Sequence, residues 1–495
     1  MSSPAYEELR DRYAGAAALE SARGVLYWDQ QTKMPSGGTP ARSKQLSALS
    51  SAHHERLTDE RVGTLLDDLA AADLSDEEAA VVREIRREYE RAAEVPRDLV
   101  ERLTTAQSDA QETWQAAKAN DDFDAFAPTL EELRELHVER AGHVDPDAAP
   151  YTVMHEDSLP YIDLDTVESV FADLREALIP LIERIETEGR ELANPFAEGE
   201  YPEDDQMELS ERVLDAVGYP EDRGRLDLSP HPFTSGNQFD CRVTTRFKED
   251  PVKGFMATLH EYGHGQYNLG LPQEEFGSPL GMALGSGVHE SQSRFWENHV
   301  GRTKAFWEGY LPEVKEVFPH LGDATPQEAY EAVNRIYPDN TIRVEADELT
   351  YHMHIILRFE TGREFVRGEI DAADIPAVWN DRMDEYLGVV PETDAAGCLQ
   401  DIHWSSRFAA FQGYTIGSVL AAQLDAAMRE DLDDVDGKIR RGEFAPLREW
   451  MTENVHRHGR RYPSDELIER ATGEPLTADY FVDYVEEKFE ALYDL

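Results

Sequence analysis

The stretch that most constrains how this chain can fold is residues 250–270, DPVKGFMATLHEYGHGQYNLG. It contains an HExxH motif made by His260, Glu261 and His264. On an α-helix, residues four apart lie on one face, so both imidazoles reach a single ion while the glutamate lies beside them. The motif therefore predicts a metal-binding helix with Glu261 as its catalytic base.

The residues around the motif favour a helix. Asp250 is a good N-cap, and Pro251 fits the first helical position because its missing N–H costs nothing there. Gly263 and Gly265 oppose the helix by about 1 kcal/mol each relative to alanine. We therefore expect these glycines to let another backbone approach closely near the metal.

Two histidines do not complete a catalytic zinc site, which usually has three protein ligands and a water. A metzincin-type third histidine would stand at position 270, where this chain has Gly270. Residues 286–297, SGVHESQSRFWE, instead predict a second, acidic helix. The Gly/Pro-rich segment 270–287 allows an antiparallel return, so we expect Glu290, 26 residues after His264, to be the third ligand.

The charge of the chain limits its partners. It has 101 acidic and 48 basic residues in 495, for a formal net charge of −53. This excess opposes binding to nucleic acid or to anionic membranes, which carry the same sign. With only 9 lysines among its basic residues, the composition is similar to that of proteins from salt-loving cells, and we expect structure to be lost on desalting.

The remaining global features predict a cytoplasmic enzyme. The sequence has no run of 18 apolar residues, and its start, MSSPAYEELRDRYAG, lacks a basic-then-apolar signal segment. Its two cysteines, Cys241 and Cys398, are too few for a disulfide framework, and we expect both to be small buried residues.

Periodicity predicts a mainly α-helical fold with one small sheet. Apolar residues recur at helical spacing through residues 4–145, and again after 325. We expect one domain over residues 1–495, with a boundary between lobes 1–195 and 196–495 in the acidic, aperiodic stretch 186–206.

Two stretches before the HExxH helix predict strands. Residues 226–233 and 240–247 are expected to pair around a turn at 235–237 as a small antiparallel sheet. A strand at this place can present a free edge to an extended peptide. Further on, residues 342–354 are expected to be helical. A pair of Arg343 with Asp347, four residues apart, would be worth little on a surface, and the density of polar groups here favours a lined cleft instead.

The order of motifs resembles the carboxypeptidase Taq family of metallocarboxypeptidases nearly from end to end. The matching pieces, in order, are YWDQQTKMP near the start, HPF at 231–233, DCRVT at 240–244, HEYGH at 260–264, HESQSRFWEN at 289–298, IRVEAD at 342–347 and GCLQDIHW at 397–404. The resemblance implies a helical zincin-type fold with a deep groove and a homodimer. It also implies removal of single residues from peptide C-termini with broad side-chain tolerance.

The resemblance assigns roles to individual residues. His260, His264 and Glu290 match the family's metal ligands, and Glu261 its catalytic glutamate. Arg343 matches the arginine expected to hold the substrate's terminal carboxylate. By the same resemblance, His403 and Tyr414 match groups that line the site. The expected substrate-binding positions are His231, Asp240, Arg242 and Gln400. One segment departs from the family pattern, because residues 405–414 lack its glycine-rich run.

We expect one Zn²⁺ per chain, with Co²⁺ or another divalent ion as the alternative. The ion would lower the pKa of a water molecule, Glu261 would take its proton, and a phenol such as Tyr414 is a candidate donor to the oxyanion. An endo-acting metallo-oligopeptidase remains the alternative function. An aminopeptidase is disfavoured, because the Gly-x-Met-x-Asn signature is absent.

Overall fold

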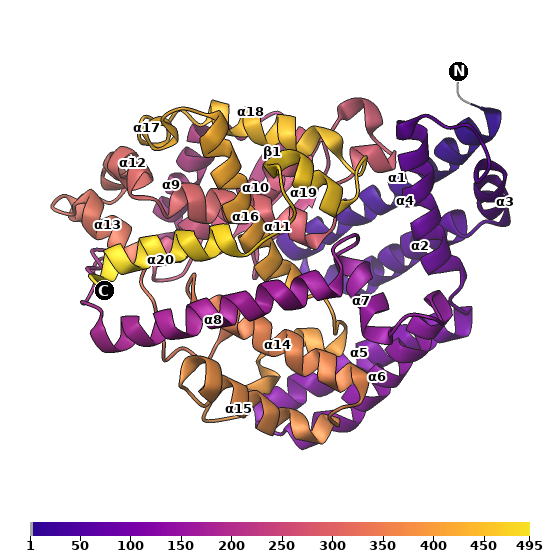
Figure 1. Cartoon of the computed structure of the whole chain (residues 1–495), viewed down its shortest axis with the longest axis horizontal. Helices are drawn as coiled ribbons and strands as arrows, with labels where there is room; N and C mark the ends of the chain where they lie inside the picture. Colours follow the sequence, from indigo (N-terminus) through magenta and orange to yellow (C-terminus); the bar gives the residue numbers. More distant parts are fainter. Residues whose placement is uncertain (1–2) are drawn as a thin grey trace.

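The computed structural model describes residues 3–495 and confirms a mainly helical fold (Figure 1). The helices of the first half are α1 (Pro4–Thr32), α2 (Thr39–Leu57), α3 (Glu60–Leu69), α4 (Asp76–Ala93), α5 (Arg97–Asn120), α6 (Phe123–Val144), α7 (Pro150–Ser158), α8 (Leu164–Glu188) and α9 (Glu203–Ala216). Those of the second half are α10 (Pro251–Gly270), α11 (Ser286–Arg294), α12 (Lys304–Val317), α13 (Pro326–Val333), α14 (Thr350–Arg367), α15 (Ile375–Leu387), α16 (Gln412–Asp431), α17 (Val435–Arg440), α18 (Ala445–Asn454), α19 (Ser464–Thr472) and α20 (Asp479–Tyr493).

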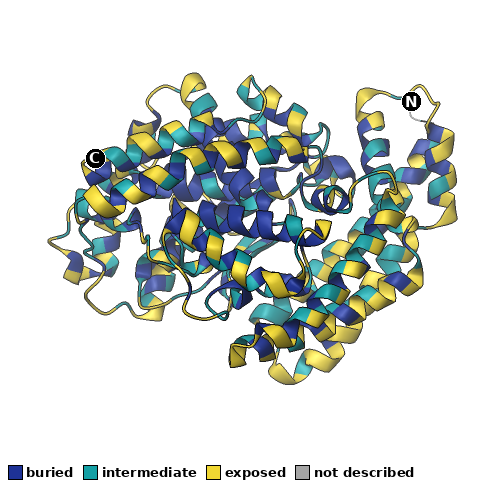
Figure 2. Cartoon of the chain, turned by 60° about the horizontal axis from the view of Figure 1, so that its bottom comes forward, coloured by how far each residue is buried: buried dark blue, intermediate teal, exposed yellow. Residues whose placement is uncertain are grey.

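Helices α10, α11 and α16 lie in the interior, and the N-terminal helices α1 to α4 gather at one end of the molecule (Figure 1). The buried side chains form one large cluster drawn from residues 95–493 and a smaller one from residues 6–85 with Leu280. Buried positions dominate the central helices, whereas outer helices alternate buried and exposed faces (Figure 2). The centre of the large cluster thus supports α10 and α11. No helix of residues 3–495 has the length and apolarity to span a bilayer.

The small sheet has three strands, β1 (Gly224–Leu228), β2 (Thr234–Gly236) and β3 (Cys241–Thr245), in the order β1-β3-β2. It is mixed, because β1 runs parallel to β3 and only β2 is antiparallel to it. The expectation of an antiparallel sheet is therefore wrong in this respect. Pro230 and Pro232 lack the N–H that a strand needs, so the first predicted strand ends at Leu228 and the chain crosses over before β2.

The order of the strands also shows that the strand before the HExxH helix does not have the free edge that was expected of it. β3, the strand that precedes the HExxH helix, is central and has both edges paired. Its two neighbours, β1 and β2, are the edge strands of the sheet, and β2 is only three residues long. Cys241, at the start of β3, is buried and free, as is Cys398, which confirms the expectation for the cysteines.

Residues 342–349 are not part of a helix, contrary to the prediction. A short 3₁₀ turn spans Arg343–Glu345, and α14 begins only at Thr350. Asp347 ends the irregular segment, because its Oδ1 accepts hydrogen bonds from the backbone N–H groups of Leu349 and Thr350 at 3.0 and 2.9 Å. An aspartate that caps a following helix competes with continuing a preceding one. Arg343 does not pair with Asp347 and instead pairs with Asp401.

Candidate metal centre and active site

The HExxH motif lies on α10, which begins as predicted. The Oδ1 atom of Asp250 accepts from the N–H of Val252 at 2.9 Å, and Pro251 is the first helical residue. A Cβ added at Gly263 would lie 2.3 Å from the carbonyl oxygen of Gln292 on α11. Gly263 therefore permits the close backbone approach that was expected. Gly265 faces the sheet more loosely, with a Val243 side-chain carbon 3.2 Å away as its nearest contact.

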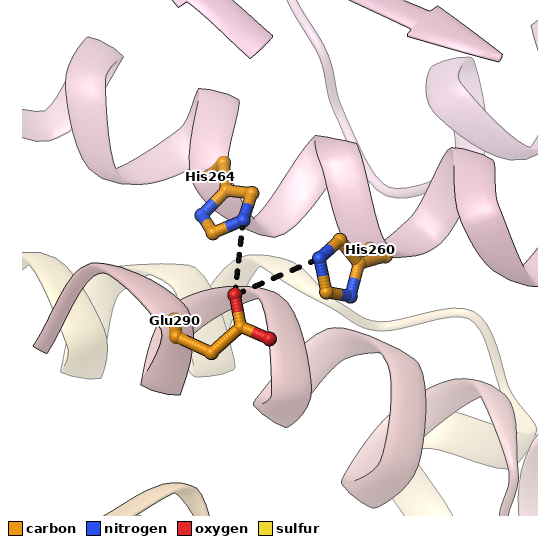
Figure 3. Close-up of side chains that lie close together, drawn as sticks. All are labelled: His260, His264 and Glu290. Carbon is orange, nitrogen blue, oxygen red and sulfur yellow. Dashed lines mark ion pairs between the residues drawn. The ribbon is translucent and has the colours of Figure 1, made fainter. Parts of the chain in front are cut away.

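His260 and His264 on α10 point toward Glu290 on α11 (Figure 3). Oε2 of Glu290 lies 3.8 Å from Nε2 of His260 and 3.4 Å from Nε2 of His264. One ligand atom from each residue falls within 4.8 Å of the others, and no second His, Cys, Asp or Glu cluster of this kind occurs in residues 3–495. The structure thus brings together the three residues predicted as metal ligands.

The outer ring nitrogen of each histidine is engaged. Nδ1 of His260 lies 2.9 Å from Oε2 of Glu297, and Nδ1 of His264 lies 3.0 Å from the carbonyl oxygen of His289. A carbonyl oxygen only accepts, so Nδ1 of His264 carries the proton and its Nε2 lone pair faces Glu290. This arrangement orients both rings for metal binding.

Two arginines hold the carboxylates in place. Arg294 donates from Nε to Oε1 of Glu290 at 2.8 Å and from Nη1 to Oε2 of Glu297 at 3.2 Å. Arg302 donates from Nη2 to Oε1 of Glu297 at 3.0 Å. Burial acts to raise the pKa of Glu290, but Arg294 and the two histidines outweigh it and hold that pKa below its usual range. Oε2 of Glu290 therefore faces the histidines as a charged oxygen.

Glu297 and Arg294 were missed in the sequence, although a signal was present. They follow Glu290 by seven and four residues, spacings that place them on the same face of a helix. Glu297 lies in a π-helical segment, Phe295–Gly301, that continues α11. Such π-helical turns occur frequently at functional sites.

The donor set fits a divalent metal ion. Two imidazole nitrogens and one carboxylate are the usual three protein ligands of a catalytic metal site that keeps one position open. Both rings are already oriented by Glu297 and by the backbone of His289. The ring of His289 stacks on that of His264, with centroids 4.5 Å apart.

Glu261 is buried beside the histidines and is fixed by the sheet. Oγ1 of Thr234, the first residue of β2, lies 2.6 Å from Oε2 of Glu261 and 2.9 Å from its carbonyl oxygen. This contact joins α10 to β2 at the carboxylate itself. Thr234 was not predicted, and no signal in the sequence links it to Glu261.

A cavity of about 300 Å³, the metal pocket, opens beside Glu290 and His264. Its wall includes His403 and Tyr414, both predicted to line the site, and also Phe411 and Arg407. Burial raises the pKa of the Tyr414 phenol above its usual value, with the charge of Glu290 acting in the same direction. Tyr414 is therefore a protonated hydrogen-bond donor at neutral pH.

Arg343 lies behind the wall of the metal pocket. It donates from Nε and Nη2 to the two oxygens of Asp401 at 3.0 and 2.6 Å, and both residues are buried. Its guanidinium lies 5.3 Å from the Phe411 ring centroid and 6.0 Å from that of Tyr414. The side chain of Gln400 accepts from the backbone N–H of Arg343 at 2.7 Å, so it supports this segment.

A second cavity of about 530 Å³, the α1 pocket, lies between α1 and the segment around β2. It shares Leu284 and His289 with the metal pocket, so the two cavities adjoin. Asp240 and Arg242 both line it and pair with each other at 2.7 Å. His231 is exposed and lines neither cavity.

Comparisons with known proteins agree with this geometry. The family model of carboxypeptidase Taq (M32) metallopeptidases matches residues 8–489. Thermostable carboxypeptidase 1 of Thermus thermophilus is 38% identical over 99% of both chains, and carboxypeptidase 1 of Bacillus subtilis is 36% identical over 98% of both. The crystal structure of the M32 carboxypeptidase from Deinococcus radiodurans R1 superposes with a TM-score of 0.96 at 37% identity and covers 100% of both chains.

The sequence motifs, the cluster of candidate metal ligands on α10 and α11, and these end-to-end matches all indicate the same family. A metallopeptidase of this kind works with a divalent metal ion, for which the described residues offer one suitable cluster. The chain belongs to the carboxypeptidase Taq (M32) family of metallopeptidases.

Proposed function

We propose that this protein is a zinc-dependent carboxypeptidase that releases single residues from peptide C-termini with broad specificity. The observation that carries the proposal is the cluster of His260, His264 and Glu290 beside the buried Glu261, in a chain of this family. His260, His264 and Glu290 would hold one Zn²⁺ per chain, and Co²⁺ or another divalent ion would fit the same donors.

A divalent ion bound there supplies a Lewis acid for the scissile carbonyl and lowers the pKa of a water molecule. Glu261 takes the proton of the attacking water and passes it to the leaving amine. Thr234 orients the carboxylate for both transfers through its 2.6 Å contact with Oε2. Because Glu261 is buried, its position changes little between the two transfers.

Tyr414 and His403 are the proposed donors to the oxyanion of the tetrahedral intermediate. Both line the cavity beside Glu290, and Tyr414 is protonated at neutral pH. A donor fixed in advance stabilises developing charge without reorganisation. Phe411 packs against both rings, with centroids 5.1 Å from His403 and 6.0 Å from Tyr414, and so limits their movement.

Arg343 is the proposed anchor for the substrate's terminal carboxylate. Asp401 holds its Nε and Nη2, and Nη1 has no hydrogen-bond partner among residues 3–495, which leaves it for the substrate. The C-terminal residue then occupies the metal pocket, and upstream residues extend past His289 into the α1 pocket. There Asp240 and Arg242 would contact the peptide backbone. By family resemblance we also propose a homodimer located in the cytoplasm.

An endo-acting oligopeptidase remains the second candidate, because the two adjoining cavities provide room on both sides of the metal ligands. The exopeptidase is favoured, because one buried arginine beside the pocket wall suits a single terminal carboxylate.

Hydrolysis of N-blocked dipeptides tests the function directly. The purified protein should release the C-terminal residue, lose this activity with a chelator and recover it with Zn²⁺ or Co²⁺. Metal analysis should find one ion per chain in the active protein and less in a His264→Ala variant. Hydrolysis that survives complete metal removal would contradict the proposal.

A further inference from the structure

Arg407 is a cation in the metal pocket whose charge has no partner. It lies in the loop between the 3₁₀ turn Ile402–Ser405, which carries His403, and helix α16, which carries Tyr414. Its side chain is exposed and lines the cavity beside Glu290. No carboxylate of residues 3–495 lies within 4.0 Å of its guanidinium, and no side-chain hydrogen bond holds it there. Apart from histidines, it is the only cationic side chain among the described residues that line this pocket.

The backbone of Arg407 is fixed although its side chain is free. Its N–H donates to the carbonyl oxygen of His403 at 2.8 Å, and its own carbonyl oxygen accepts from Nη2 of Arg358 at 3.4 Å. The next residue, Phe408, is buried against Trp404 and Phe365. A long side chain with a fixed origin therefore extends along the mouth of the pocket.

The two arginines at this pocket differ in depth and in charge balance. Arg343 is buried and compensated by Asp401, and it lies behind the ring of Phe411. The terminal carboxylate is common to every substrate and must lie close to the scissile bond, which suits the deep position. Arg407 instead lines the exposed wall of the metal pocket, beside the space proposed for the C-terminal residue.

The charge of the whole protein does not decide which substrates reach this cation. We expect the protein, with a net charge of −53, to be folded at molar salt, where the Debye length is about 3 Å and only direct contacts with the substrate matter. A guanidinium forms its strongest hydrogen bonds with carboxylates in such direct contacts.

We propose that Arg407 binds the side-chain carboxylate of the substrate's C-terminal residue and so gives the enzyme a preference for peptides that end in glutamate or aspartate. The inference rests on the proposed carboxypeptidase function. Arg407 then selects the substrate, and the chemical step remains with the groups beside the metal ligands.

The test compares four N-blocked dipeptides that end in Glu, Gln, Leu and Lys. In the wild type, kcat/KM for the Glu substrate should exceed that for the Gln substrate about tenfold, mainly through KM. Arg407→Gln should remove this preference and leave the Gln and Leu substrates within about twofold of the wild type. Arg407→Glu should invert it, so that a dipeptide ending in Lys becomes better than one ending in Glu.

Arg97→Gln is the matched control. Arg97 is also an exposed arginine without an ion pair among residues 3–495, but it starts α5 and lines neither pocket. Its substitution changes net charge equally and should leave the Glu preference intact. Circular dichroism of each variant establishes that it is folded.

Four outcomes would overturn the inference. An equal fall for the Glu, Gln and Leu substrates in Arg407→Gln would assign Arg407 to the terminal carboxylate. An unchanged preference for the Glu substrate in Arg407→Gln would show that Arg407 does not bind the substrate side chain. Loss of this preference in Arg97→Gln as well would show the same. Absence of hydrolysis of any substrate by the metal-loaded wild type would instead overturn the proposed function together with this inference.

Discussion

Glu261 depends on a single hydroxyl group for its orientation. Thr234 contacts both the carboxylate and the backbone carbonyl of Glu261, and it comes from β2 rather than from the metal helix. A general base acts only within hydrogen-bond reach of the proton it takes, so a small rotation of this carboxylate lowers kcat.

Replacing the hydroxyl should therefore reduce turnover. We expect Thr234→Val to lower kcat about tenfold with metal content unchanged, because valine keeps the shape of threonine but cannot donate. Thr234→Ser restores the donor and should recover most of the activity. Steady-state kinetics with metal analysis tests this, and equal activity of the valine and serine variants would contradict it.

Glu297 acts on the metal through His260. It accepts from Nδ1 of the ring and is itself held by Arg294 and Arg302. Groups at this position typically change metal affinity by 10- to 100-fold. We expect Glu297→Gln to weaken Zn²⁺ binding by about that factor, measured by competition with a chromophoric chelator. Glu308→Gln, whose carboxylate pairs with Arg440 on the surface, is the control and should bind Zn²⁺ normally; unchanged affinity in Glu297→Gln would contradict the role.

At the scale of elements, the site requires α10 and α11 to be in near backbone contact. A Cβ at Gly263 would lie 2.3 Å from Gln292 O and 2.6 Å from Ser293 Cα, both backbone atoms that cannot move independently of α11. Glycine thus serves packing here at the expense of helix propensity.

Gly263→Ala should separate the two helices. We expect a loss of about 3 kcal/mol in the free energy of unfolding together with weaker metal binding, since Glu290 moves away from the histidines. Gly265→Ala is the matched control, because its nearest neighbour is a Val243 side-chain carbon at 3.2 Å. It should stay within about 1 kcal/mol of the wild type. Urea denaturation of both variants measures their free energies of unfolding, and equal values would contradict the predicted packing role of Gly263.

The elements that the sequence predicted well are those set by local signals. Asp250, Pro251 and the four-residue spacing of the histidines fix where α10 begins and which face it presents. The prediction of a continuous helix over residues 342–354 was wrong. Asp347 is compatible with a helix interior or with a helix cap, and in the folded protein it caps the following helix. The parallel pairing of β1 with β3 depends on a crossover connection that no local sequence pattern indicates.

The site shows the same division. The four-residue spacing placed Glu261 beside both histidines, and the acidic second helix after a Gly/Pro-rich return suggested Glu290. Helical spacing extended by seven residues from Glu290 would have found Glu297. Thr234 is 27 residues from Glu261 and Arg343 is 58 from Asp401, so these contacts follow only from the fold.

On the scale of the whole molecule, charge repulsion opposes folding. At a net charge of −53, neighbouring carboxylates repel strongly unless salt screens them, and the Debye length falls to about 3 Å at 1 M. We expect dialysis from molar to millimolar KCl to reduce the helical circular dichroism signal, with recovery when salt is restored. A spectrum unchanged between the two conditions would contradict this expectation.

Buried histidines should make the fold sensitive to acid. Burial lowers the pKa of His352 to about 3, that of His354 to about 4 and that of His456 to about 3. They stay neutral in the folded state and take up protons when unfolded below pH 6.5, so their contribution to stability is present above pH 6.5 and is lost as pH falls.

Each of these histidines should cost about 1.4 kcal/mol per pH unit between pH 6.5 and 4.5. Urea midpoints measured at pH 7, 6 and 5 in molar KCl, where carboxylate repulsion is screened, should therefore decrease steadily. The measured range of pH 5 to 7 lies above the usual pKa of carboxylates, which keeps their contribution to the change small. A midpoint independent of pH across it would contradict the account.

The proposed activity removes residues from free C-termini with the metal held by α10 and α11. Its most direct test is mass spectrometry of one N-blocked peptide, as free acid and as C-terminal amide, incubated in molar KCl with and without chelator. We expect a ladder of single-residue losses from the acid alone, abolished by the chelator. Internal cleavage of both peptides would contradict it and support the endo-acting oligopeptidase.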